Sequence, residues 1–538
     1  MDRQTSGESK QSHWALPPLP WIGPELAASA ILQLGNVRRV LTDTSPRHVR
    51  CILSRAWRMM LNLEVREALS LVDAVEPGLA ELETNVSESL RMEVDLLRAA
   101  GLALQDDSAG AIAIARLILR PGRAPAASVH RGAATICRWA YWKAADVESL
   151  HSLTRGDPGV VLDKMRALTT AIDLSIEAAA EFEQLRPGTA LRLARDATTL
   201  AEKFLGPGST AAVLSASIVA RVLYEGGHFA EAESLLRERL GDITARGTIE
   251  AALRAYPILA RIAVRKMQPE MAYELLAQAE SLGERRGWLR LRAASLAEQV
   301  HLLLAQGRHE DAVEVVKRLD EVSSQARSTH SPVGSSIQRY RVIAKARLES
   351  ARGPSASAVA ALRQVHHDAV RRRDFYSALQ TVLWIVEGLL SLGEHQEAVS
   401  LFDRTLEVGG ALGMYEMFID CGPRVAQLLP GAYERAGTQG NSRAALLPYI
   451  GSLLNRWQTY EPSRPQAAPS MRTSGPLSQR EQHVLKLIGS GLSNKQIAQT
   501  LAIAPETVKS HAKNIFIKLD VRTRTEAAMR AQQRGILL

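Results

Sequence analysis

Lys509, Ser510 and Lys513 form a short polar pattern near the C-terminus that could contact a nucleic acid. If this segment is helical, residues three and four positions apart share one face, so these side chains would lie close together. Lysine can donate to guanine N7 and O6 or to a phosphate oxygen, and serine can pair with either kind of base edge. The pattern does not separate base reading from phosphate anchoring. The alternative is a pair of solvated lysines on an exposed helix.

The neighbouring residues predict the helix that would hold this pattern. Val508, Ala512, Ile515 and Leu519 recur at helical spacing on another face, which is expected to pack against a hydrophobic core. Pro505 suits the first position of such a helix, because the amide it lacks would have no partner there. We therefore expect one buried face and one polar face.

Three more helices are expected around this one. Ser478, Ser493 and Thr523 each precede a Glu or Gln by three residues, which is the pattern of a capping box. Together these signals predict four helices, at about 479–489, 494–501, 505–519 and 524–534.

The second and third of these helices predict a DNA-binding motif. Two short helices joined by a three-residue turn form a helix-turn-helix, here at about 494–513, whose second helix enters the major groove. Lys509, Ser510 and Lys513 would then face DNA. Further candidate phosphate contacts, each with an exposed surface position as the alternative, are Lys495, Thr507, Lys518 and Arg522.

Positive charge is concentrated in the same segment. Residues 477–538 contain ten Lys and Arg against four Asp and Glu, which is +6 of the chain's formal net charge of +9. A compact basic module suits a polyanion, because neutralising phosphates drives sequence-independent affinity. A solvated basic surface is the alternative on charge alone.

The C-terminal motifs resemble those of the LuxR-type DNA-binding domain. The matching stretches are Leu477-Ser478-x-Arg480-Glu481, Gly491-Leu492-Ser493-Asn494-Lys495-x-Ile497-Ala498, Thr507-Val508-Lys509-x-His511, Asn514-Ile515-Phe516-x-Lys518-Leu519 and Arg524-Thr525-Glu526-Ala527. The resemblance implies a four-helix domain at 477–538 that binds promoter DNA as a homodimer, with the last helix at the dimer contact. It makes Ala527, Ala528 and Ala531 candidate dimer residues, although these alanines could instead pack on the first helix. Ala504 departs from the family, which usually has Ser or Thr there.

A short phrase recurs in the long segment before this module. Gly227-His228-Phe229-Ala230-Glu231-Ala232 is echoed at 307–312 and 393–398, with a degenerate copy at 267–272. Each alanine that closes a phrase, and Ala358 as well, is followed three and four residues later by one pair of apolar residues. These pairs are Leu235-Leu236, Leu275-Leu276, Val315-Val316, Ala361-Leu362 and Leu401-Phe402. Weaker echoes occur at Ala68 and Ala111.

This repeat predicts a stack of helical hairpins. One helix stops at a glycine, and an alanine in the next helix lets the two axes approach closely, while each hairpin needs a neighbour to cover its outer face. Aromatic residues make up only 5% of the chain and strong helix formers recur throughout, so the expected class is all-α. The phrase resembles the tetratricopeptide signature. Its period of about 40 residues is longer than the usual 34 of that family and resembles the repeats of MalT-type regulators, over about residues 45–455.

The rest of the sequence gives weaker expectations. Residues 1–25 are expected to be a disordered lead-in, and the Pro-rich stretch 458–476 to be a linker. Three scattered cysteines, no secretory signal and no long apolar run predict a cytoplasmic protein with neither disulfides nor a membrane span. The cysteines are Cys51, Cys137 and Cys421.

No residue constellation predicts catalysis, a metal or a cofactor. MalT-type regulators usually carry an ATPase module, but this sequence has no G-x-x-x-x-G-K-[ST] phosphate loop. His366-His367-Asp368, followed by Arg371-Arg372-Arg373, is expected to be a solvated helix face rather than a metal site. Trp139, Tyr141 and Trp142 could line a pocket, although packing within the helix core is favoured.

We therefore expect a non-enzymatic transcriptional regulator. Its head would bind double-stranded promoter DNA, and its repeats would sense a small-molecule or peptide effector, RNA polymerase or another regulatory protein. One alternative is a protein-interaction scaffold in which the DNA-binding head is only accessory. Another is a sigma-like polymerase subunit, against which the long repeat body argues.

Overall fold

The chain divides into two compact units, Met1–Arg464 and Pro465–Leu538. The computed structural model describes residues 45–123, 125–153, 163–326, 332–438, 441–460, 479–501, 508, 512, 515, 521 and 523–533. These residues form helices and turns and contain no strand, which confirms the all-α class. The expected lead-in at 1–25 lies outside them, as does most of the expected linker.

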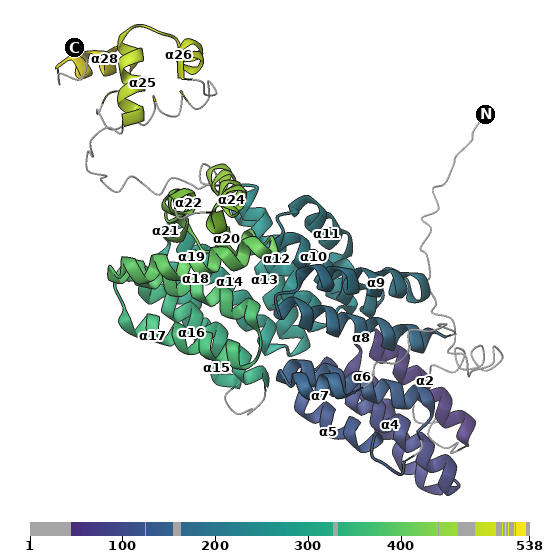
Figure 1. The fold of residues 1–538 in the computed structure, drawn as a ribbon. Helices are drawn as coiled ribbons and strands as arrows, with labels where there is room; N and C mark the ends of the chain where they lie inside the picture. The colour runs from purple at the N-terminus through teal and green to yellow at the C-terminus, as the bar shows by residue number, and fades with distance from the viewer. Residues whose placement is uncertain are drawn as a thin grey trace, which may run out of the picture. The chain divides into compact units, whose positions relative to one another are not determined.

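The first unit, which we call the repeat unit, is a series of antiparallel helices (Figure 1). Its helices up to Leu412 are α2 (Pro46–Leu61), α3 (Val65–Val75), η2 (Glu76–Glu81), α4 (Thr84–Leu104), α5 (Ser108–Ile118), α6 (Ala127–Ala144), α7 (Val147–Ser152), α8 (Lys164–Glu183), α9 (Pro187–Leu205), α10 (Thr210–Glu225), α11 (Phe229–Arg246), α12 (Ile249–Arg265), α13 (Pro269–Arg286), α14 (Leu289–Ala305), α15 (His309–Ala326), α16 (Pro332–Arg352), α17 (Ala356–Arg371), α18 (Phe375–Leu392) and α19 (His395–Leu412).

Successive helices pair into nine hairpins within this described part of the chain, from α2 with α3 to α18 with α19. The first helix of each hairpin also contacts the first helix of the next along the whole series. Each hairpin thus buries its apolar face against its neighbours, as a solenoid requires. This confirms the predicted stack of helical hairpins.

The glycines of the recurring phrase end the first helix of their hairpins. Gly227, Gly307 and Gly393 have φ of 80°, 74° and 80°, the left-handed region that glycine adopts without steric cost. After Gly227, the amide of His228 donates to the carbonyl of Leu223 at 2.9 Å, which is the closing bond of a Schellman motif. The chain therefore reverses within three residues.

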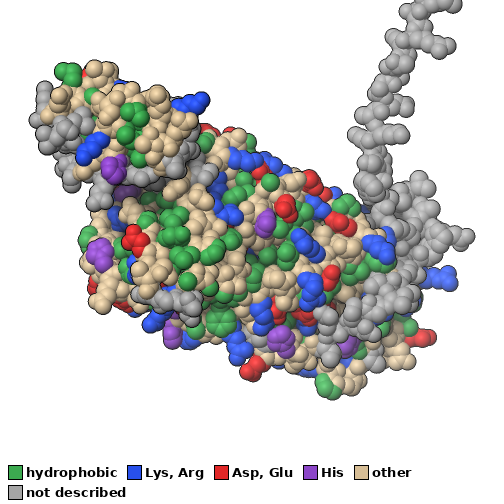
Figure 2. Space-filling view, turned by 45° about the horizontal axis from the view of Figure 1, so that its top comes forward, with side chains coloured by type: hydrophobic (Ala, Val, Ile, Leu, Met, Phe, Trp, Pro, Cys, Tyr) green, Lys and Arg blue, Asp and Glu red, His purple; other side chains and the backbone are tan. Residues whose placement is uncertain are grey.

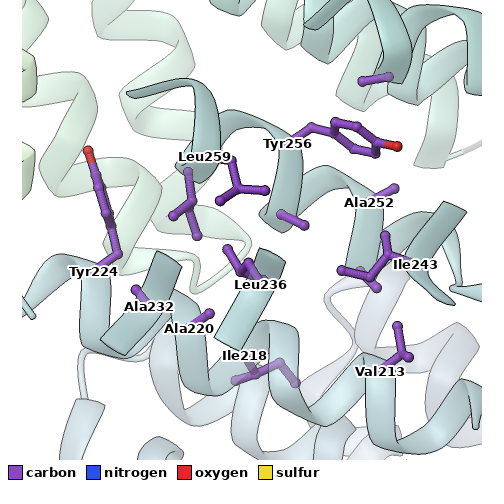
Figure 3. Close-up of a cluster of buried hydrophobic side chains, with 14 of the residues drawn as sticks. Val213, Ile218, Ala220, Tyr224, Ala232, Leu236, Ile243, Ala252, Tyr256 and Leu259 are labelled. Carbon is purple, nitrogen blue, oxygen red and sulfur yellow. The ribbon is translucent and has the colours of Figure 1, made fainter. Parts of the chain in front are cut away.

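The alanine five residues after each of these glycines is fully buried. Ala232, Ala312 and Ala398 are 0% exposed, and so is Ala272 in the degenerate copy. Figure 3 shows Ala232 and Leu236 of α11 among the buried side chains of α10 and α12. These small side chains let the two helices of a hairpin pack closely, as the sequence predicted.

The same turn also occurs where no glycine marks it. Leu63, Asp106, Leu185 and Met267 have φ between 60° and 69°. Each is likewise followed five residues later by a fully buried alanine, namely Ala68, Ala111, Ala190 and Ala272. The repeat is therefore regular in structure even where the sequence phrase is degenerate, weak or absent.

The hairpin turns give a direct test of this backbone argument. Gly307→Ala should destabilise the repeat unit by about 1 kcal/mol, because a Cβ is unfavourable at positive φ. An added Cβ at Gly307 would meet no atom within 4 Å, so the cost would come from the backbone alone. Gly353→Ala is the matched control, because Gly353 also has open space but no positive φ. Equal denaturation midpoints for the two variants would contradict the argument.

The regular hairpins stop at Leu412, earlier than the expected end at about 455. Gly413 and Gly422 have positive φ, and Pro423 starts a new helix, so short helices follow until α24 (Leu447–Tyr460). The short helices are α20 (Glu416–Asp420), α21 (Pro423–Ala426), α22 (Leu429–Thr438) and α23 (Asn441–Ala444). Because α24 continues to Tyr460, the first residues of the expected linker at 458–476 are helical.

Helix α20 packs against the middle of the solenoid. The amide of Tyr415 donates to the carbonyl of Glu225 at 2.8 Å. The hydroxyl of Tyr224 donates to Asp420 at 2.9 Å, and Arg261 and Arg265 pair with the same carboxylate. The segment after the hairpins is thus fixed to α10 and α12, far back along the chain.

One described helix, α18, is long and apolar enough to cross a membrane. It packs between α17 and α19 and buries Leu383 and Val386, which is typical of a core helix in a folded protein. On the face in Figure 2, Lys and Arg side chains are interspersed with Asp and Glu over the repeat unit. That mixture is consistent with a small net charge on the repeat unit.

The second unit, which we call the head, contains α25 (Gln479–Gly489), α26 (Asn494–Leu501) and α28 (Arg524–Gln533). These bounds agree to within one residue with the helices expected at 479–489, 494–501 and 524–534. Val508, Ala512 and Ile515 are also helical. The rest of the expected third helix lies outside the described residues, as does Ala504.

Candidate functional site

The head is built around a small hydrophobic core. Val484, Leu485 and Ile488 of α25 and Ile497 of α26 are at most 3% exposed, and α25 also packs on α28. Val508, Ala512 and Ile515 are buried in the same core. The predicted core face of the third helix is thereby confirmed at these three positions.

A capping box fixes the start of α26. The amide of Ser493 donates to Oε1 of Gln496 at 2.9 Å, and the amide of Gln496 donates to Oγ of Ser493 at 3.4 Å. At the start of α28, the amide of Glu526 donates to Oγ1 of Thr523 at 3.2 Å. These bonds satisfy amides that have no partner within their own helices. The box at Ser478 lies outside the described residues.

Arg524 joins the starts of α26 and α28. Its Nη1 donates to Oδ1 of Asn494 at 3.0 Å, and its Nη2 donates to the carbonyl of Leu492. Arg524 lies in the Arg524-Thr525-Glu526-Ala527 motif, but no role was predicted for it, because its partners at 492 and 494 are about 30 residues away in the sequence. Arg524 positions α26 and with it Lys495.

The structure places one of the seven predicted DNA contacts. Lys495 is exposed at the second position of α26, where a phosphate could reach it. The other six, Thr507, Lys509, Ser510, Lys513, Lys518 and Arg522, lie outside the described residues. Their roles stay predictions.

The three candidate dimer residues do not share one environment. Ala527 and Ala531 are 0% exposed and belong to the core of the head itself. This packing corresponds to the alternative in which the alanines pack on the first helix. Ala528 is half-buried, and its neighbour Met529 is 58% exposed. Dimerisation through α28 stays a prediction. Of the three candidates, Ala528 is the one whose side chain is still accessible to a partner.

A second site lies inside the repeat unit. A cavity of about 330 Å³ opens between α6, α8, α10, α12, α14, α16 and α18, with α20 at one side. Trp142 lines it, whereas Trp139 and Tyr141 are buried in a neighbouring core. The three aromatic residues singled out in the sequence therefore divide between packing and the cavity.

Buried ion pairs hold distant hairpins together at this cavity. Arg290 donates to both carboxylate oxygens of Asp106 at 2.8 Å, and Lys143 lies 3.1 Å from the same carboxylate. Glu250 contacts both cations, and all four side chains are at most 8% exposed. Burial alone would raise the pKa of Glu250, but Arg290 and Lys143 hold it well below its usual range. The four charges join four hairpins, because Asp106 lies in the turn between α4 and α5, and Lys143, Glu250 and Arg290 lie in α6, α12 and α14.

Arg372 departs from the solvated helix face expected for residues 366–373. It is half-buried and lines the cavity, whereas His367 and Arg371 are exposed. Asp368 pairs with Arg371 at 2.6 Å, as a solvated helix face would allow. The sequence could not show the difference, because it depends on Arg372 lining the same cavity as residues of α16 such as Arg339, which lie far from it in the chain.

Glu183 is a cavity carboxyl with an unusual environment. Trp142 Nε1 donates to it at 3.1 Å. Burial, reinforced by the negative charge of Asp374, raises the pKa of Glu183 to about 8. Near neutral pH this side chain is therefore mainly uncharged.

This pKa predicts a pH dependence of stability. The folded protein keeps the Glu183 proton up to about pH 8, whereas an unperturbed glutamate loses it near 4.5, so the folded state binds more protons in between. The free energy of unfolding should fall as pH rises through this window, by up to about 1.4 kcal/mol per pH unit. Glu183→Gln should reduce that slope in urea titrations between pH 6 and 9, and Glu416, whose pKa burial also raises to about 8, should supply what remains. Glu231→Gln, at an exposed position, should leave the slope unchanged. Parallel slopes for all three proteins would contradict the assignment.

The fold and the two sites define a helical-repeat protein with a C-terminal helix-turn-helix domain. The model described as MalT-like TPR region matches residues 159–435, and the model described as Bacterial regulatory proteins, luxR family, matches residues 475–531. The first match covers more than half of the chain. The chain therefore belongs to the proteins with a MalT-like TPR region, and it carries a LuxR-family head.

Similar proteins include several regulators named MalT. The HTH-type transcriptional regulator MalT of Vibrio cholerae serotype O1 is 33% identical over 162 residues, which is 28% of this chain and 18% of that protein. The MalT of Serratia proteamaculans is 52% identical over 71 residues, or 13% of this chain and 8% of that protein. The chain thus matches less than a fifth of the length of these relatives.

A solved structure shares the fold of the repeat unit. It is the crystal structure of Rap protein complexed with competence and sporulation factor, with a TM-score of 0.51 and 15% sequence identity. The match covers 69% of this chain and 100% of that one. At this identity the likeness shows the fold alone.

Proposed function

We propose that this protein is a DNA-binding transcriptional regulator whose head binds promoter DNA as a homodimer. The observation that supports this most directly is the core of the head. Val508, Ala512 and Ile515 are helical and buried between α25, α26 and α28, as the second helix of a helix-turn-helix requires. The predicted DNA contacts alternate with these positions along the sequence.

The repeat unit would supply the regulatory input. Its hairpins surround a cavity large enough for a small effector, and relatives of this architecture are named as transcriptional regulators. A bound effector, RNA polymerase or another regulatory protein would change how the head engages DNA. We place this activity in the cytoplasm.

Helix α20 connects the cavity to the end of the repeat unit. Asp420 and the adjacent Cys421 line the cavity. On the same helix, Glu416 pairs at 3.2 Å with Arg456 of α24, the last described helix before the head. A ligand that moves α20 would therefore also act on α24.

The experiment that tests the proposed function compares full-length protein with a chain lacking residues 470–538. Genome-wide DNA occupancy should be lost on deletion, and expression of the occupied genes should change. A scaffold with an accessory head would instead keep its captured partners and most of its phenotype. Full-length protein that occupies no promoter would refute the proposal.

A further inference from the structure

The cavity in the repeat unit is lined by more positive than negative side chains. Its lining includes eight Lys and Arg and five Asp and Glu. One of the five, Glu183, is mainly neutral near pH 7 because burial raises its pKa to about 8. The cations outnumber the charged acids about two to one.

Six of the eight cations have a carboxylate partner. Arg261 pairs with Glu298 and Asp420, and Arg339 pairs with Asp374. The other paired cations, each within 4 Å of a carboxylate, are Lys143, Arg221, Arg290 and Arg347. These pairs are part of the structure and leave little charge for a ligand.

Arg254 and Arg372 have no such partner in the described part of the chain. The guanidinium of Arg254 donates to the carbonyl of Glu250 at 3.2 Å and lies 5.9 Å from the ring of Trp142, but no carboxylate is within 4 Å. Arg372 lines the cavity beside Arg339, which is already paired with Asp374. Burial lowers the pKa of both arginines, because desolvation disfavours their charged forms.

Desolvation of Arg254 and Arg372 is only partly offset by carboxylates farther than 4 Å away, Glu250 for Arg254 and Asp374 for Arg372. An unpaired charge in a desolvated site destabilises the fold, and side chains that retain such a cost are often functional. An oxyanion is the group that satisfies a guanidinium best, because it accepts two parallel hydrogen bonds. The cavity volume is at the lower end of the range for small-molecule sites and favours a small molecule over an extended peptide.

We infer that the cavity binds a small organic or inorganic oxyanion, a carboxylate or a phosphate, through Arg254 and Arg372. Trp142 and Trp384 line the same cavity and offer apolar faces to the rest of such a ligand. This inference rests on the proposed function in one respect, since it gives the effector of the proposed regulator its chemical class.

The inference is tested with full-length protein and three anionic probes: inorganic phosphate, pyrophosphate and citrate. Binding is followed by thermal unfolding and by tryptophan fluorescence, with sodium chloride at equal ionic strength and trehalose as controls. At least one anion should raise Tm above both controls. A cavity that responds to trehalose or a short neutral peptide but to none of the three anions would overturn the inference, and so would no response at all.

The site is assigned with Arg254→Met and Arg372→Met. Each substitution should lower the affinity for the best-binding anion by about tenfold or more, because a charge-assisted hydrogen-bond pair is lost. Neither should lower Tm much without ligand, because each removes a guanidinium whose desolvation is only partly offset by neighbouring carboxylates. Arg318→Met removes an exposed arginine on α15 and should keep full anion affinity. Unchanged affinity in both cavity variants would place the anion elsewhere and overturn the assignment.

DNA retardation is measured on the same preparations. Loss of anion binding in a variant that still retards DNA would support the cavity assignment and leave the proposed function intact. Wild-type protein that binds the anion but retards no DNA would refute the proposed function and not the cavity. The two failures are therefore distinguishable.

Discussion

Lys509→Ala/Lys513→Ala should weaken binding of the full-length protein to its promoter DNA by about 100-fold or more. Each lysine is predicted to make a base or phosphate contact, and such contacts contribute on the order of 1 to 3 kcal/mol. The core face that would support this helix is buried at Val508, Ala512 and Ile515, so the substitutions should not unfold the head. The measurement is a mobility shift on a fragment selected from genomic DNA with the wild-type protein.

The control removes two positive charges elsewhere in the head. Lys486→Ala/Arg530→Ala changes exposed residues of α25 and α28 that are not predicted contacts, and it should retain most of the affinity. The DNA affinity of Lys495→Ala should lie between those of the two double variants. Its salt dependence should be smaller than that of the wild type, because a phosphate contact is lost. Unchanged retardation by the Lys509 and Lys513 double variant would refute their assignment as DNA contacts.

The hairpin turns show what the sequence could and could not predict about the fold. Gly307 and Gly393 were readable, because glycine is the usual residue at positive φ after a helix. Leu63 and Leu185 occupy the same turn position, although an L side chain there costs about 1 to 2 kcal/mol. Their tertiary packing overrides the local preference, so no glycine marked these turns, and only the weaker echo at Ala68 indicated the hairpin that Leu63 closes.

The head was more predictable than the cavity for a physical reason. Capping boxes and helical periodicity are local, so the bounds of α25, α26 and α28 followed from the sequence. The cavity depends on partners far apart in the chain, such as Asp106 and Arg290, which are 184 residues apart. Lys143 and Glu250, which are 107 residues apart, are also brought together by the tertiary fold, and nothing local to either residue indicates their contact.

Asp106→Asn should destabilise the repeat unit by about 3 to 5 kcal/mol, since removing one member of a buried charge network leaves its partners uncompensated. Arg290 and Lys143 would then share Glu250 alone. Asparagine is the informative replacement, because Asp106 has a φ of 69° and asparagine tolerates that conformation. The backbone should therefore remain as it is, and the loss would report the charge.

Asp311→Asn is the matched control for this prediction. Asp311 also accepts from an arginine, Arg308 at 2.6 Å, but both side chains are more than half exposed. An exposed pair contributes at most about 1 kcal/mol, so this variant should unfold close to wild type in urea. If Asp106→Asn also unfolded close to wild type, the four buried charges would not be what joins the early hairpins to α12 and α14. That joint would then depend on the apolar cluster that contains Leu63 and Trp288, and on the hydrogen bonds from Arg286 to the carbonyl of Leu63 and from Trp288 to the carbonyl of Leu104.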